Sequence, residues 1–64
     1  MKVSTLIAKG KAEGVEIRVT HKLDDPAIEY RRDDDDIWLF GGWSQDVLSS
    51  SYSQLAPVIA DLLD

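Results

Sequence analysis

The chain has 64 residues, no cysteine and one histidine, and its formal net charge is −5. A domain of this length buries only about 60% of the surface that its unfolded chain exposes, so we expect one thin-cored domain over residues 1–64. Without thiolates, and with His21 as the only imidazole, the chain offers neither a disulfide nor a zinc site. No apolar run approaches the roughly 20 residues of a membrane span and no signal peptide is recognisable, which predicts a cytoplasmic protein.

The charge is spread unevenly along the chain. Residues 1–23 carry five basic and two acidic side chains, a net +3, whereas residues 24–64 carry ten acidic and two basic ones, a net −8. Such an asymmetry indicates an electrostatic partner rather than a requirement of the fold. Because phosphates need a basic footprint, the sign argues against nucleic acid as a direct ligand. Proteins whose own groove is basic are the expected partners.

The N-terminal segment predicts a short helix. Ser4 is a good N-cap for a helix over Thr5–Glu13, and Gly14 fits the left-handed residue that follows a helix. Ile7 and Gly10 share one helical face, which predicts that Ile7 is buried. Gly10 weakens the helix by about 1 kcal/mol relative to alanine, unless it lets the backbone approach a sheet closely.

Two strands are predicted next. Residues 15–20 alternate strictly and predict a strand whose Val15, Ile17 and Val19 face inward. Asp24-Asp25-Pro26 predicts a turn, because proline presets its φ and aspartate bonds to the neighbouring backbone. Residues 27–32 predict a second strand with Ile28 and Tyr30 on its inner face.

Four aspartates, Asp33–Asp36, then predict a second turn, and Ile37–Phe40 predicts a third strand. This strand is apolar on both faces, which indicates a central position or helices on both sides. Gly41-Gly42 is expected to end it. The simplest arrangement of the three strands is an antiparallel meander.

The C-terminal segment predicts an amphipathic helical stripe. Its apolar residues recur at helical spacing: Leu48, Tyr52, Leu55, Ile59 and Leu62. An interior proline costs about 3 kcal/mol, so Pro57 predicts two short helices, Gln45–Tyr52 and Pro57–Leu63, or one helix kinked there. Ser44 is the expected cap of the first.

The predicted fold class is therefore α+β, with a short N-terminal helix, a three-stranded antiparallel meander and a C-terminal helical segment packed on one sheet face. The predicted core consists of Ile7, Val15, Ile17, Val19, Ile28, Tyr30, Ile37, Leu39, Leu55, Ile59 and Leu62.

The run Asp33–Asp36 next to the apolar Ile37–Phe40 is the most informative feature of the sequence. One interpretation is a solvated turn that adds charge for solubility. A second is a divalent-cation site, but calcium loops alternate their ligands with spacers and a glycine, and four consecutive aspartates do not match that spacing. A third is phosphate mimicry, in which carboxylates occupy the arginines and lysines that another protein aims at nucleic acid.

Geometry favours phosphate mimicry. A meander places Asp24 and Asp25 at one end of the sheet and Asp33–Asp36 at the other, roughly 17–20 Å apart. Glu29 and Asp46 would fill the interval if they faced the same side. Of the two tryptophans, we expect Trp38 in the core and Trp43 exposed as an anchor. The predicted partner-binding residues are Asp24, Asp25, Glu29, Asp33, Asp34, Asp35, Asp36, Trp43 and Asp46.

No constellation of residues predicts catalysis. Ser49–Ser53 offer hydroxyls without a base at a recognisable spacing, and Gly41-Gly42 lacks the rest of a phosphate loop. A catalytic carboxylate pair needs two separate environments in a cleft, which a solvated turn does not supply. We expect no enzymatic activity, no cofactor and no metal.

In its size, lack of cysteine, net charge and Asp33–Asp36 run, the chain resembles the small acidic inhibitors of phages and mobile elements, of the anti-CRISPR and anti-restriction DNA-mimic type. This resemblance implies a non-enzymatic inhibitor in the host bacterial cytoplasm, which blocks the DNA site of a nuclease or CRISPR effector.

The alternative is a small docking module that binds a partner through a sheet edge or an apolar groove. Segments 6–15, 28–31 and 55–63 resemble the β-hairpin docking domains of multienzyme assembly lines, whereas the aspartate run and the Ile37–Phe40 strand depart from that pattern. An exposed edge strand and Trp43 would support a homodimer. Excess negative charge opposes self-association, and we expect a monomer.

Overall fold

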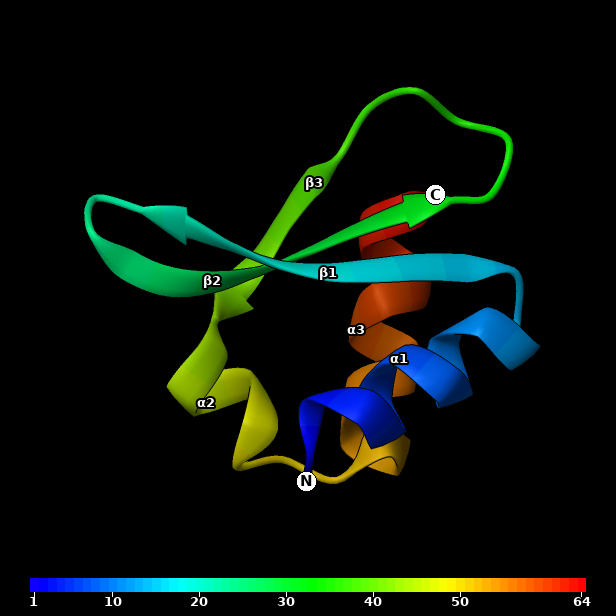
Figure 1. Ribbon diagram of the computed structural model, residues 1–64. Coiled ribbons are helices and arrows are strands. Elements are labelled where there is room, and N and C mark those ends of the chain that lie inside the picture. Colours follow the sequence, from blue (N-terminus) through cyan, green and yellow to red (C-terminus); the bar gives the residue numbers. More distant parts are fainter.

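The computed structural model describes all 64 residues as one three-stranded sheet with three helices on one of its faces (Figure 1). The elements in chain order are α1 (Val3–Ala12), β1 (Val15–Lys22), β2 (Asp25–Arg32), β3 (Leu39–Trp43), α2 (Ser44–Leu48) and α3 (Tyr52–Leu63). The strands pair antiparallel in the order β1-β2-β3. The predicted α+β fold with an antiparallel meander is confirmed.

Helix α1 lies directly against β1 because a glycine faces the sheet. A Cβ atom on Gly10 would collide with the side chain of Ile17, so only glycine permits this approach. The helix begins at Val3 after Lys2, and the predicted cap at Ser4 is wrong. Leu6, not Ile7, points into the core, and Ile7 stays exposed.

The β1–β2 hairpin turns tightly at Leu23 and Asp24, which have φ of 54° and 68°. Two successive residues with positive φ match the right-handed twist of the flanking strands. The predicted turn at Asp24–Pro26 is therefore displaced, and Pro26 lies within β2 opposite His21. The hairpin end projects beyond the helices (Figure 1), which leaves Val19 41% exposed rather than buried.

Strand β3 starts later than predicted and contains the two glycines. Its pairing with β2 shifts register between Ile28 and Glu29. Gly41 lies so close to the Tyr30 ring that a Cβ atom would collide with it, and Gly42 has a φ of +125°. The glycines therefore form an irregularity within the strand instead of ending it. Ile37 lies in the preceding loop and is 65% exposed.

The C-terminal helices separate at residues 49–51 and not at the proline. Ser51 and Gln54 form a capping box, in which the Ser51 backbone N–H donates to Gln54 Oε1 at 2.9 Å and the Gln54 N–H donates to Ser51 Oγ at 3.4 Å. Pro57 lies inside α3 with its ring exposed. Trp43, and not Ser44, occupies the N-cap of α2.

The core lies in one layer between the sheet and the helices. Its buried side chains are Leu6, Val15, Ile17, Ile28, Tyr30, Val47, Leu55 and Ile59. Ala27 is also buried, but the register places it on the opposite face of the sheet, across from Thr20 and Trp43. Of the predicted core, Leu39 is only partly buried, and Ile7, Val19, Ile37 and Leu62 are exposed. None of the three helices has the length and apolar content that a membrane crossing requires.

Candidate functional site

The face of the sheet opposite the helices, called here the open face, is covered by no helix (Figure 1). Strand alternation and the observed register place charged and aromatic side chains on it together. They are Glu16, Arg18 and Lys22 from β1, Glu29 and Arg31 from β2, and Phe40 and Trp43 from β3. Aromatic residues and arginine are the types most enriched at binding hot spots.

Trp38 lies across the open face on two guanidinium groups. The centre of its ring is 4.1 Å from Cζ of Arg18 and 4.5 Å from Cζ of Arg31. Contacts at these distances are attractive because the ring face is electronegative. The expectation that Trp38 belongs to the core is therefore wrong. Its ring instead fastens the loop between β2 and β3 to the sheet.

Both arginines under Trp38 are neutralised by glutamates directly across the hairpin. Arg18 Nη2 lies 2.7 Å from Glu29 Oε1, and Arg31 Nη2 lies 2.9 Å from Glu16 Oε2. These pairs follow from the register, which sets Arg18 opposite Glu29 and Glu16 opposite Arg31. Glu29, a predicted partner-binding carboxylate, is thus committed to Arg18 and is only 19% exposed.

A second aromatic group occupies the other half of the open face. Phe40 and Trp43 meet edge to face, with ring centres 5.2 Å apart and planes at 71°. The Lys22 ammonium lies 4.8 Å from the centre of the Phe40 ring. The shift in β3 register sets these two aromatic residues on the same face. Trp43 is partly exposed, as predicted, but so is Trp38.

The run Asp33–Asp36 forms the loop that Trp38 fastens, and all four side chains are exposed. Two backbone hydrogen bonds order the loop: the Asp33 N–H donates to the carbonyl of Gly14, which precedes β1, and the Asp35 N–H donates to the Arg32 carbonyl. Asp35 Oδ1 also accepts the Ile37 N–H at 3.2 Å. None of the four carboxylates is in a salt bridge. The like charges are therefore held together on the surface without internal cations.

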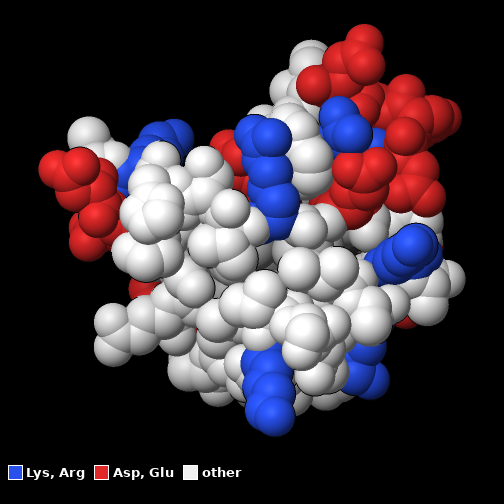
Figure 2. Space-filling model, viewed as in Figure 1, with Lys and Arg blue, Asp and Glu red and all other residues white.

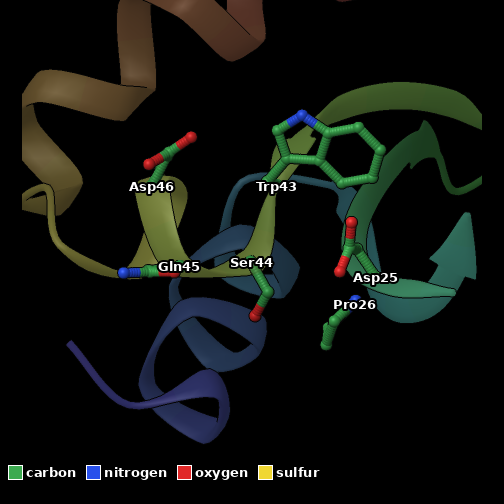
Figure 3. A pocket seen from close by; sticks show the side chains of 6 residues that line it. All are labelled: Asp25, Pro26, Trp43, Ser44, Gln45 and Asp46. Carbon is green, nitrogen blue, oxygen red and sulfur yellow. The ribbon is translucent and has the colours of Figure 1, made fainter. Parts of the chain in front are cut away.

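The remaining predicted acids gather at the opposite end of the sheet. An open hollow of about 490 Å³ is lined there by Asp25, Pro26, Trp43, Ser44, Gln45 and Asp46. Figure 3 shows Asp25 from β2 and Asp46 from α2 on opposite sides of Ser44, with the Trp43 indole above. Asp24 lies in the adjacent hairpin turn. Asp46 thus extends the Asp24–Asp25 end and does not fill the interval between the two acidic ends.

Acidic side chains therefore mark both ends of the sheet, as the meander predicts. Figure 2 shows one acidic patch over the loop between β2 and β3 and a smaller one at the hairpin turn. Asp64, which is not among the predicted partner-binding residues, has its carboxylate 3.6 Å from the Arg32 guanidinium. With that pair, every arginine of the chain faces an acidic partner. The alternation Glu16-x-Arg18 and Glu29-x-Arg31 was the signal that would have revealed the paired charges.

The exposed carboxylates and aromatic rings are groups that bind a partner through charge and apolar contact. No three acidic or histidine side chains are placed to hold a metal ion, and the four consecutive aspartates do not converge on one point. Away from the open face, burial raises the pKa of Tyr52, and a hydrogen bond from its hydroxyl to Glu13 Oε2 at 3.1 Å raises it further. Burial also raises the pKa of Tyr30. The raised pKa of each tyrosine therefore reflects its packing beneath the sheet.

A scan against protein-family models, a search of curated proteins and a search of solved structures found no significant match to this chain.

Proposed function

We propose that this protein is a non-enzymatic inhibitor that occupies a basic nucleic-acid-binding site on a partner protein. The single observation that carries the proposal is the Asp33–Asp36 loop, whose four carboxylates are exposed, ordered and free of internal cations. A site that binds phosphates uses arginine and lysine, which form charge-assisted hydrogen bonds with carboxylates equally well. The resemblance to anti-CRISPR and anti-restriction DNA mimics points to a bacterial nuclease or CRISPR effector in the host cytoplasm.

The open face supplies the second half of the proposed interface. Its half-exposed Trp38 and Phe40 lie over the middle of the sheet and Trp43 lines the hollow at the Asp25 end, so a partner bound to both acidic ends would cover them. Buried aromatic anchors inside a charged rim are typical of tight protein–protein interfaces. Because the arginines of this face are already paired, they add little repulsion toward a basic partner.

A matched pair of variants tests the role of the loop. Asp34→Asn/Asp35→Asn and Glu13→Gln/Asp61→Asn remove the same charge from two different places, and a glutamine side chain at position 13 can still accept the Tyr52 hydrogen bond. Immobilised wild-type and variant proteins would be used to capture partners from a bacterial lysate. We expect the loop variant to capture clearly less of the partner than the wild-type protein and the control to capture as much. Equal capture by both variants would contradict the proposal.

One observation favours the alternative of a docking module. A hollow of about 320 Å³ lies between α1 and β1, lined by the apolar Ile7, Val15 and Ile17 and at its rim by the charged Lys11, Glu16 and Asp33. A partner bound through this hollow would associate with little dependence on salt, whereas steering by the acidic loop makes association fast at low salt and slower at high salt. The salt dependence of the association rate therefore separates the two functions.

A further inference from the structure

The two edges of the sheet differ in how they are protected. Strand β3 is short, is shifted in register and contains two glycines, which are features that discourage further pairing. Strand β1 pairs with β2 from Val15 to Lys22 without a bulge, and it contains no proline. No charged side chain of β1 points to the helix side, where Val15, Ile17 and Val19 lie. The outer edge of β1 is thus open to another strand.

We propose that this edge pairs with the same edge of a second copy, giving a dimer with a continuous six-stranded sheet. In an antiparallel pair of identical strands related by a two-fold axis, one residue lies opposite itself. With Val19 on the axis, Glu16 lies opposite Lys22 of the second copy and Arg18 lies opposite Thr20. The ion pair between Glu16 and Lys22 occurs twice, and no like charges face each other.

The competing registers are less favourable. A pair centred on Arg18 sets two arginines directly opposite each other, which is destabilising. A pair centred on Ile17 runs past Val15 into Gly14, where the chain has a φ of +76° and leaves the sheet for α1. The Val19 register uses residues 16–22 of both strands, and it also covers the exposed Val19 side chain.

The same register matches two apolar features that the monomer leaves exposed. Leu23 is the most exposed large apolar residue of the chain, at 84%. The paired strands end at residue 22, and Leu23 of the second copy, in the turn that follows, comes next to Val15 and to the hollow lined by Ile7, Val15 and Ile17 together with Lys11, Glu16 and Asp33. Removing apolar surface from water stabilises association. The Leu23 side chain and the hollow are therefore complementary parts of one surface.

The net negative charge that opposes self-association does not lie on β1. The negative charge is concentrated in residues 24–64, whereas residues 1–23, which include the whole of β1, carry a net +3. Of the exposed run Asp33–Asp36, only Asp33 lines the hollow beside β1, and its backbone N–H donates to the Gly14 carbonyl. Pairing through β1 also leaves the open face free, so the dimer would present two copies of the proposed inhibitory surface.

Light scattering over a range of concentrations tests the dimer. We expect a mass of about twice 7.1 kDa at high micromolar concentration. Val19→Lys places a charge on the helix side of the edge strand and should weaken self-association by at least about tenfold. The variant should keep a native circular dichroism spectrum. A monomeric mass at millimolar concentration would overturn the proposal, as would a dimer unaffected by Val19→Lys.

Cysteine crosslinking tests the register, since the natural chain has no cysteine. Opposite residues of an antiparallel pair have Cα atoms about 4.5–5.5 Å apart, within reach of a disulfide. Val19→Cys should form a covalent dimer rapidly under mild oxidation. Thr20→Cys is the control, because each Thr20 lies opposite Arg18 and not opposite the other Thr20. Equal crosslinking of both variants, or none with Val19→Cys, would contradict this register. Neither experiment depends on the acidic loop, so the dimer and the inhibitor proposals fail separately.

Discussion

Replacing Trp38 by alanine should lower the free energy of unfolding by about 2–3 kcal/mol. The ring rests on two guanidinium groups, and each such contact contributes about 0.5–1 kcal/mol at an exposed site. Shielding the buried part of the indole from water contributes on the order of 2 kcal/mol more. The released loop regains about 1 kcal/mol of backbone entropy, which offsets part of the loss.

Urea unfolding measures this change in the free energy of unfolding. It should be followed by far-ultraviolet circular dichroism and not by tryptophan fluorescence, because the substitution removes one of the two tryptophans. A double-mutant cycle isolates the stacking. Arg18→Met combined with Trp38→Ala should show a coupling of about 0.5–1 kcal/mol. Lys22→Met is the matched control, since Lys22 lies over Phe40 and not over Trp38, and its effect should add to that of Trp38→Ala within about 0.5 kcal/mol. A loss below about 0.5 kcal/mol, or no coupling with Arg18, would refute the fastening of the loop by Trp38.

Three further predictions concern the layer beneath the sheet. Ile28→Ala should lower the free energy of unfolding by about 2–5 kcal/mol, because Ile28 is fully buried; an unchanged urea midpoint would show that the core is assigned wrongly. Gly41→Ala should cost about 1–3 kcal/mol through its collision with Tyr30, and a neutral result would place the β3 backbone further from that ring. Because the pKa of Tyr52 is raised in the fold, its contribution is complete below the unfolded pKa of about 10 and is lost as pH rises through the folded pKa. Stability should therefore fall in that alkaline window, and Tyr52→Phe should lessen the fall; an identical pH profile for the variant would count against the packing of Tyr52.

The sequence predicts the order of the elements well because several local signals agree. Alternation identifies β1 and the inner residues Val15 and Ile17, and the unusual glycine at position 10 is explained by close packing on the sheet. The exposure of the residues at the end of β1 could not be predicted, because burial there depends on how far the helices extend beneath the hairpin. Val19 has the same pattern as Ile17 but lies beyond that cover.

For the third strand and the C-terminal helices, prediction from the sequence failed for a different reason. An apolar stretch such as Ile37–Phe40 suggests burial on both faces, yet Trp38 and Phe40 are held on an open face by cations from other strands. Sequence spacing along one strand does not reveal these partners. Pro57 was expected at the start of the last helix. The capping box at Ser51 and Gln54 instead starts α3 at Tyr52, so Pro57 lies inside the helix. The positions of the acidic ends were predictable, since they follow from the meander alone.

The proposed inhibition is tested most directly by competition with nucleic acid. The partner captured by the immobilised protein would be titrated with duplex DNA, and its release would be compared for wild type and for Asp34→Asn/Asp35→Asn. If carboxylates of the Asp33–Asp36 loop occupy a phosphate site, duplex DNA should displace the partner, and less DNA should suffice for the variant. A partner that binds no nucleic acid, or that stays bound at saturating DNA, would contradict the central claim.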